Sequence, residues 1–191
     1  METKLTAAAT ADGIRLGDGV IEYSSVIQQL DSGHYDKSVS EGMRAIACVW
    51  EAQESGWFHP SPEQEVIIWR WLVAAVFLGE EQDKNGIAEI QNDEGGIDRA
   101  VIYVGKDGSI GLYPGPTRFA LACHVEGIAL EKYGAGIGLE MAVRIYRSMV
   151  IADPKQGFSM SKTGRKGLEI LHDEFIEQIN TDGMPEMPVT H

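Results

Sequence analysis

Apolar residues recur with a helical period along much of the chain, and the clearest such segment lies near its middle. Residues 62–79 are apolar on almost every side, with Arg70 as an interruption. An apolar pattern of this kind predicts a central, buried helix. Ser61 and Gln64 form the capping signal at its start, and Gly79 is predicted to end it. The apolar run is shorter than the about 20 residues that a membrane span needs, so no membrane association is expected.

The same spacing predicts further helices before and after this segment. They are expected over residues 25–30, 39–54, 117–133, 136–150 and 162–179. Two other stretches contain short apolar runs on either side of a glycine-containing turn, which predicts β-hairpins at residues 13–23 and 100–113. Between the central helix and the second hairpin, residues 80–98 are acidic and contain three glycines. We expect them to form a connection.

These elements predict a mainly α fold of the α+β class, with about five to six helices and one or two small β-hairpins. The globular domain is placed at residues 13–180, between a flexible lead at 1–12 and a loose tail at 181–191. A chain of 191 residues is long enough to bury a substantial core. Its 43% apolar and 24% charged residues are typical of a soluble, globular protein.

The chain is acidic, with a formal net charge of −13. Nucleic acid is therefore not an expected partner, because phosphate binding needs a basic surface. The charges are also segregated along the sequence. Residues 51–98 hold 11 acidic and 2 basic side chains, whereas residues 140–167 hold 6 basic and 2 acidic. We expect the two regions to provide a polar contact surface for another protein or for a second copy of the chain.

The two cysteines, Cys48 and Cys123, lie in predicted helices among apolar residues. Neither belongs to a pattern of cysteines and histidines with metal-ligand spacing. We expect no metal and no cofactor. Two buried free thiols fit a reducing compartment, and residues 1–13 lack the apolar core of a signal peptide. The expected location is the cytoplasm.

A candidate catalytic acid is Glu54, at the end of the helix predicted for residues 39–54. Continuing the apolar row of that helix places Glu54 on its apolar face, where burial beside a tryptophan would raise the pKa of a carboxyl group. Glu54, Ser55 and the aromatic pair Trp57 and Phe58 resemble the start of the catalytic motif of lytic transglycosylases and related enzymes of the lysozyme fold. That resemblance implies cleavage of peptidoglycan, with Glu54 as general acid.

Two further resemblances involve the region that follows the central helix. Glu94 and the hairpin residues Asp107 and Ser109 resemble the phage-type lysozyme pattern, which implies Glu94 as the alternative general acid. Residues 81–92 resemble an EF-hand loop and imply a cation site, although position 12 is Asn92 where a high-affinity site has a bidentate glutamate.

None of these patterns forms a complete catalytic constellation, so the interpretation that we favour is a small acidic protein that binds other proteins and is not an enzyme. Inhibitors, immunity proteins, chaperones and accessory proteins of viruses or mobile elements are the types considered. Aromatic residues in connecting segments often anchor interfaces, and exposed arginines of the basic segment add charge. The candidate binding residues are Trp57, Phe58, Tyr113, Phe158, Arg144 and Arg147.

Overall fold

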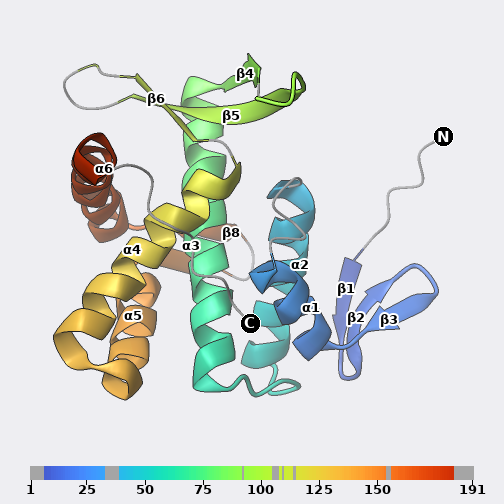
Figure 1. Ribbon diagram of the computed structural model, residues 1–191. Coiled ribbons are helices and arrows are strands. Elements are labelled where there is room, and N and C mark those ends of the chain that lie inside the picture. The colour runs from blue at the N-terminus through green and yellow to red at the C-terminus, as the bar shows by residue number, and fades with distance from the viewer. Residues whose placement is uncertain are drawn as a thin grey trace.

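The molecule is built around one long central helix, α3 (Pro62–Asn85), with other helices on both of its sides (Figure 1). A computed structural model describes residues 7–32, 39–91, 93–104, 108, 110–113, 115–153 and 156–182. Helices α1 (Tyr23–Asp31) and α2 (Val39–Glu54) lie on one side of α3. Helices α4 (Gly115–Tyr133), α5 (Ala135–Met149) and α6 (Lys162–Asp182) lie on the other side.

Helix α3 is buried over most of its length, as its apolar pattern predicts. Ser61 and Gln64 exchange the two hydrogen bonds of a capping box at its start. The predicted end at Gly79 was wrong, because the helix continues to Asn85 and ends at Gly86, whose φ is 88°. A glycine inside a helix costs only about 1 kcal/mol. The contacts of the flanking buried residues Leu78 and Glu81 offset that cost.

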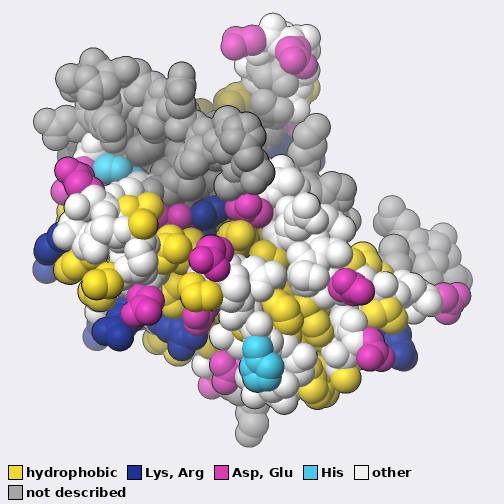
Figure 2. All heavy atoms as spheres, turned by 60° about the horizontal axis from the view of Figure 1, so that its bottom comes forward, with side chains coloured by type: hydrophobic (Ala, Val, Ile, Leu, Met, Phe, Trp, Pro, Cys, Tyr) yellow, Lys and Arg dark blue, Asp and Glu magenta, His cyan; other side chains and the backbone are white. Residues whose placement is uncertain are grey.

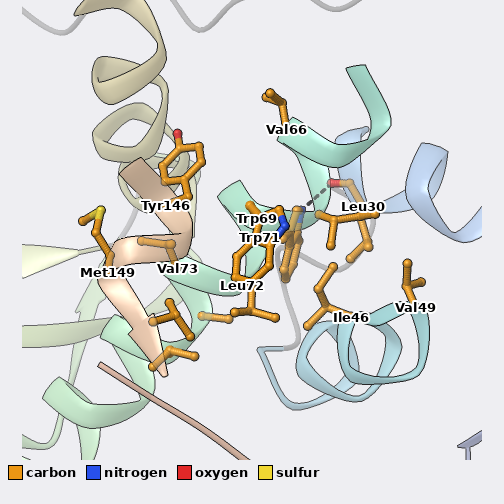
Figure 3. Close-up of a cluster of buried hydrophobic side chains, with 14 of the residues drawn as sticks. Leu30, Ile46, Val49, Val66, Trp69, Trp71, Leu72, Val73, Tyr146 and Met149 are labelled. Atoms are coloured by element: carbon orange, nitrogen blue, oxygen red, sulfur yellow. Dashed lines mark hydrogen bonds between the residues drawn. The ribbon is translucent and has the colours of Figure 1, made fainter. Parts of the chain in front are cut away.

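The core between α2 and α3 depends on one close approach. Trp71 lies against Gly42 of α2, where an added Cβ would be 2.2 Å from the indole ring. Its indole N–H donates to the carbonyl of Leu30 at 2.8 Å and so joins α3 to α1. Figure 3 shows Trp71 next to Leu30 and Ile46, while Tyr146 lies on the opposite side, on α5. One continuous core therefore lies on both sides of α3.

The N-terminal sheet has the order β1-β2-β3, with strands Ala7–Thr10, Gly13–Leu16 and Gly19–Ile21. The hairpin predicted at residues 13–23 is thus confirmed. The flexible lead predicted over residues 1–12 was wrong for residues 7–10, which form β1. Those residues pair with β2 through tertiary context that an alanine-rich sequence does not reveal. Residues 1–6 of the lead lie outside the described residues.

A second antiparallel sheet, β4-β5-β6, covers the C-terminal end of α3. Its strands are Ile87–Gln91, Ile97–Val104 and Ile110–Tyr113. The predicted hairpin at residues 100–113 corresponds to β5 and β6 and is confirmed. The connection predicted at residues 80–98 was wrong, because those residues complete α3, form β4 and begin β5. The EF-hand resemblance fails for the same reason: Glu81, Asp83 and Asn85 lie on a helix and not in a loop.

The C-terminal part contains α4, α5 and α6, close to the bounds predicted for them. A third, two-stranded sheet of β7 (Val150–Asp153) and β8 (Gly157–Met160) lies between α5 and α6 and was not predicted. Of the predicted tail, residues 181–182 end α6, and residues 183–191 lie outside the described residues. With six helices and small antiparallel sheets in its described residues, the chain has the predicted mainly α, α+β fold. No described helix is both long and apolar enough to cross a membrane.

Candidate functional site

The β5–β6 hairpin carries a cluster of exposed apolar side chains. Antiparallel pairing places Ile102 opposite Leu112, and Val104 opposite Ile110. Opposite residues and residues two apart share one face of a sheet, so these four side chains form one cluster, which we call the hairpin patch. The exposed fraction is 72% for Ile110 and 41% for both Val104 and Leu112. Large apolar side chains that gather at this exposure are typical of contact surfaces.

Strand β5 joins the hairpin patch to the end of α3 through Ile102. Ile102 donates its N–H to the carbonyl of Gly86, and its own carbonyl accepts from Asn85 Nδ2, both at 3.2 Å. Asn85 Nδ2 also donates to Glu81 Oε2 at 2.7 Å. Next to Ile102, Val101 is buried and belongs to the core. The backbone of Gly86, the side chain of Asn85 and the core contacts of Val101 thus anchor β5 to the end of α3.

Glu81 is the most deeply buried acid in this anchor. Burial raises the pKa of the Glu81 carboxyl above its usual range, an effect that the nearby charges of Lys84 and Arg165 partly oppose. The carboxylate accepts one hydrogen bond, from the Asn85 side chain on the next helical turn. No described group of three or more histidine, cysteine or acidic side chains surrounds it that could hold a metal ion. Glu81 therefore has a structural role, because it holds the Asn85 side chain that is hydrogen-bonded to β5.

The structure does not assemble a site around either candidate acid. Glu54 is the last residue of α2 and is exposed, so its predicted place on the apolar face was wrong. Glu54 is exposed although Ala52, two residues before it, is fully buried, because the helix ends at Glu54 and the chain turns away at Gly56 with a φ of 71°. Glu94 is also exposed, in the turn between β4 and β5. Its predicted companions Asp107 and Ser109 lie outside the described residues.

The aromatic candidates divide into one exposed and two packed residues. Trp57 follows α2 and is 45% exposed. Phe58 lies against Tyr23, with ring centroids 5.4 Å apart, and Phe158 of β8 meets the edge of Trp50 at 5.2 Å. Both are half-buried against the core. The side chain of Tyr113 lies outside the described residues, although its backbone ends β6.

The basic segment meets the acidic region within the same chain. Arg147 pairs with Glu65 and stacks over the Trp69 ring at 5.1 Å from its centroid. Arg165 pairs with Glu80 at 2.6 Å, and Glu80 also accepts the backbone N–H of Met160. Figure 2 shows basic and acidic side chains interspersed over the left part of one face. The segregation along the sequence thus reflects complementary helices that pack together.

Arg144 differs from Arg147, because it is exposed on α5 and no ion pair joins it to another described residue.

The most extensive charged cluster lies inside the molecule. Arg70 donates to both carboxylate oxygens of Glu126, at 2.6 and 2.8 Å, and to Asp31 at 3.1 Å. The Tyr146 hydroxyl donates to Glu126 at 2.9 Å. Arg70, which interrupts the apolar pattern of α3, therefore connects α1, α3, α4 and α5.

The described cysteine and histidine side chains do not form a reactive cluster. Cys48 is a buried free thiol, and burial raises its pKa, which keeps it protonated and unreactive. His124 lies 3.8 Å from Glu174 across α4 and α6. The side chain of Cys123 lies outside the described residues. Among the described residues, Cys48 and His124 do not lie together in a common site.

Comparisons of the chain with protein-family models, with curated proteins and with solved structures found no match.

The surface that sequence reasoning missed is the hairpin patch. Its signal was present in the run from Ile102 to Val104 and in Ile110 and Leu112, which alternate on the predicted strands. A hairpin is expected to bury one face, so the sequence alone did not show that this face is exposed.

Proposed function

We propose that this protein acts by binding another protein, and that the hairpin patch is its main contact surface. The observation that carries the proposal is the exposure of Val104, Ile110 and Leu112 on one face of an anchored hairpin. Full burial of an exposed side chain of this size contributes about 1.5–3 kcal/mol, and a partner gains the share that corresponds to the 41–72% still exposed. An apolar cluster of this kind supplies the apolar centre that protein interfaces require.

The proposal has further support from the acids and bases of the chain. Glu54 and Glu94 are exposed, and no hydrogen bond or ion pair joins either side chain to another described residue. Arg147 and Arg165 have carboxylate partners in the same molecule. A docking surface that relies on Arg147 or Arg165 would have to break these pairs. An apolar surface needs no such rearrangement.

The test is affinity capture from host lysate with a charged substitution in the patch. Val104→Glu changes an exposed side chain, so the variant is expected to fold, as circular dichroism would verify. Its matched control is Ile137→Glu, on α5, where the side chain is also exposed. We expect a stoichiometric partner that the wild type and the control retain and that Val104→Glu loses. Retention by all three proteins, or loss by both variants, would refute the proposed surface.

A further inference from the structure

Strand β6 forms an edge of its sheet, and its outward main-chain groups can be assigned. The N–H and the C=O of Ile102 both point to the β4 side, where Gly86 and Asn85 bond to them. Main-chain groups alternate in direction along an antiparallel strand, so the pair of Ile102 with Leu112 is not hydrogen-bonded. The N–H and C=O groups of Leu112, and of Ile110 two residues before it, therefore point away from β5 to the open edge.

Among its described residues, β6 lacks the charged side chains and prolines that usually prevent strand pairing. Natural edge strands are protected by charged side chains, by proline or by a bulge. The residues of β6 are Ile110, Gly111, Leu112 and Tyr113, none of which is charged or proline. The opposite edge, β4, has Glu89 at its centre. Two copies of β4 paired about that residue would bring two carboxylates face to face, whereas two copies of β6 would not.

We propose that two copies of this chain associate through their β6 strands, which pair antiparallel about a two-fold axis at Gly111. In this register Ile110 of each copy lies opposite Leu112 of the other. These are the residues whose main-chain groups point outward, so four hydrogen bonds form across the axis. The two sheets become one continuous sheet of six strands, in the order β4-β5-β6-β6-β5-β4.

The two-fold axis keeps the same face of each sheet on the same side. Ile110 and Leu112 belong to the hairpin patch, so pairing places the two patches next to each other. The dimer thereby presents a single apolar surface of twice the size, with two-fold symmetry. Four residues per strand bury less area than a permanent interface requires. We expect a weak dimer whose population rises with protein concentration.

The first experiment is a charge exchange on β6, measured by sedimentation velocity over a range of protein concentrations. The variants are the double substitutions Ile110→Glu/Leu112→Glu and Ile110→Lys/Leu112→Lys. Each alone places like charges opposite each other and is expected to weaken the dimer at least about tenfold. An equimolar mixture places Glu opposite Lys and is expected to recover the association. A wild type that stays monomeric at every concentration, or a mixture that does not associate, would overturn the proposal.

The second experiment tests the register with a single cysteine. Gly111 lies on the axis in a pair without hydrogen bonds, where Cα atoms are about 4.5 Å apart, a separation that suits a disulfide. Gly111→Cys is expected to form a disulfide-linked dimer under mild oxidation. The wild type, with its native thiols, and Glu89→Cys on β4 are the controls. Equal cross-linking of Glu89→Cys, or none of Gly111→Cys, would contradict the pairing.

These results can be separated from those for the foreign partner. Val104→Glu lies one strand away from the axis, so it is expected to reduce partner capture while it leaves the dimer within a few-fold of wild type. If the Glu and Lys variants fail to associate when mixed while partner capture still depends on the patch, only the dimer proposal is refuted. If the dimer forms as expected but Val104→Glu does not affect partner capture, only the proposed function is refuted.

Discussion

Replacement of Glu126 by alanine is expected to be among the most destabilising changes of a single polar side chain. Glu126 is one of the two buried charged residues among the described side chains and accepts three hydrogen bonds, two from Arg70 and one from Tyr146. The side chains of Arg70 and Glu126 are only 13% and 10% exposed. Without Glu126, the guanidinium keeps its bond to Asp31 but loses both bonds to the Glu126 carboxylate while it stays largely buried.

The expected cost follows from this geometry. Removal of one partner of a buried ion pair costs about 3–5 kcal/mol, because the other charge stays without its partner. For a chain of this size that corresponds to a fall in Tm of about 6–20 °C. Urea unfolding followed by circular dichroism measures the free energy of unfolding. A loss below about 1 kcal/mol would show that water reaches Arg70 and would refute the account of a buried network.

A combined variant separates buried charge from simple loss of contact. Arg70→Met, Glu126→Leu and Tyr146→Phe together replace the polar groups by apolar ones of similar size. Such replacements of buried ion pairs are often neutral or stabilising, and Asp31 is closer to the surface, at 18% exposure. The triple variant is therefore expected to be more stable than Glu126→Ala alone. If the triple variant loses as much free energy of unfolding as the three single variants together, the hydrogen-bonded network contributes net stability.

Three further predictions concern single residues. Burial raises the pKa of Glu81 in the folded state, so its ionisation favours unfolding as the pH rises from about 4.3. Glu81→Gln should therefore raise Tm at pH 7 and lose that gain below about pH 4. An equal gain in Tm at both pH values would contradict a raised pKa in the folded state. The Cys48 thiol should react with a thiol reagent only on unfolding, which a comparison of Cys48→Ala with wild type would reveal. Gly42→Ala should destabilise the protein by about 1–3 kcal/mol in urea, since the added methyl group meets the ring of Trp71, while Gly127→Ala, with open space around its Cα, serves as the control.

The helices could be predicted from the sequence because their signals are local. The apolar pattern and capping residues of α3 identify its start, and the stripes of α5 and α6 identify their extents. The end of α3 could not be predicted from Gly79. There the tertiary contacts of Leu78 and Glu81 outweigh the weak helix preference of one glycine. Strands β1, β4, β7 and β8 were missed because they are stabilised by pairing with their partner strands, which the local sequence does not reveal.

The candidate site was harder to predict for the same reason. Glu54 and Glu94 drew attention because their local sequences resemble known motifs, but exposure depends on where a helix ends in three dimensions. Arg147 is a basic residue in a basic segment, and only the packing of α5 against α3 shows that Glu65 is its partner. The hairpin patch is the opposite case. Its strands could be predicted, while its exposure depends on how little of the molecule covers that end of α3.

The distribution of charge also gives a direction for how association should respond to salt. Arg147 and Arg165 pair with Glu65 and Glu80 of the same chain, and the chain as a whole keeps its net charge of −13. Two copies therefore repel each other at long range, and salt screens that repulsion. Pairing through the uncharged strand β6 should strengthen as salt rises. Capture of a basic partner by acidic surface groups should instead weaken, so the sign of the salt effect distinguishes the two modes of association.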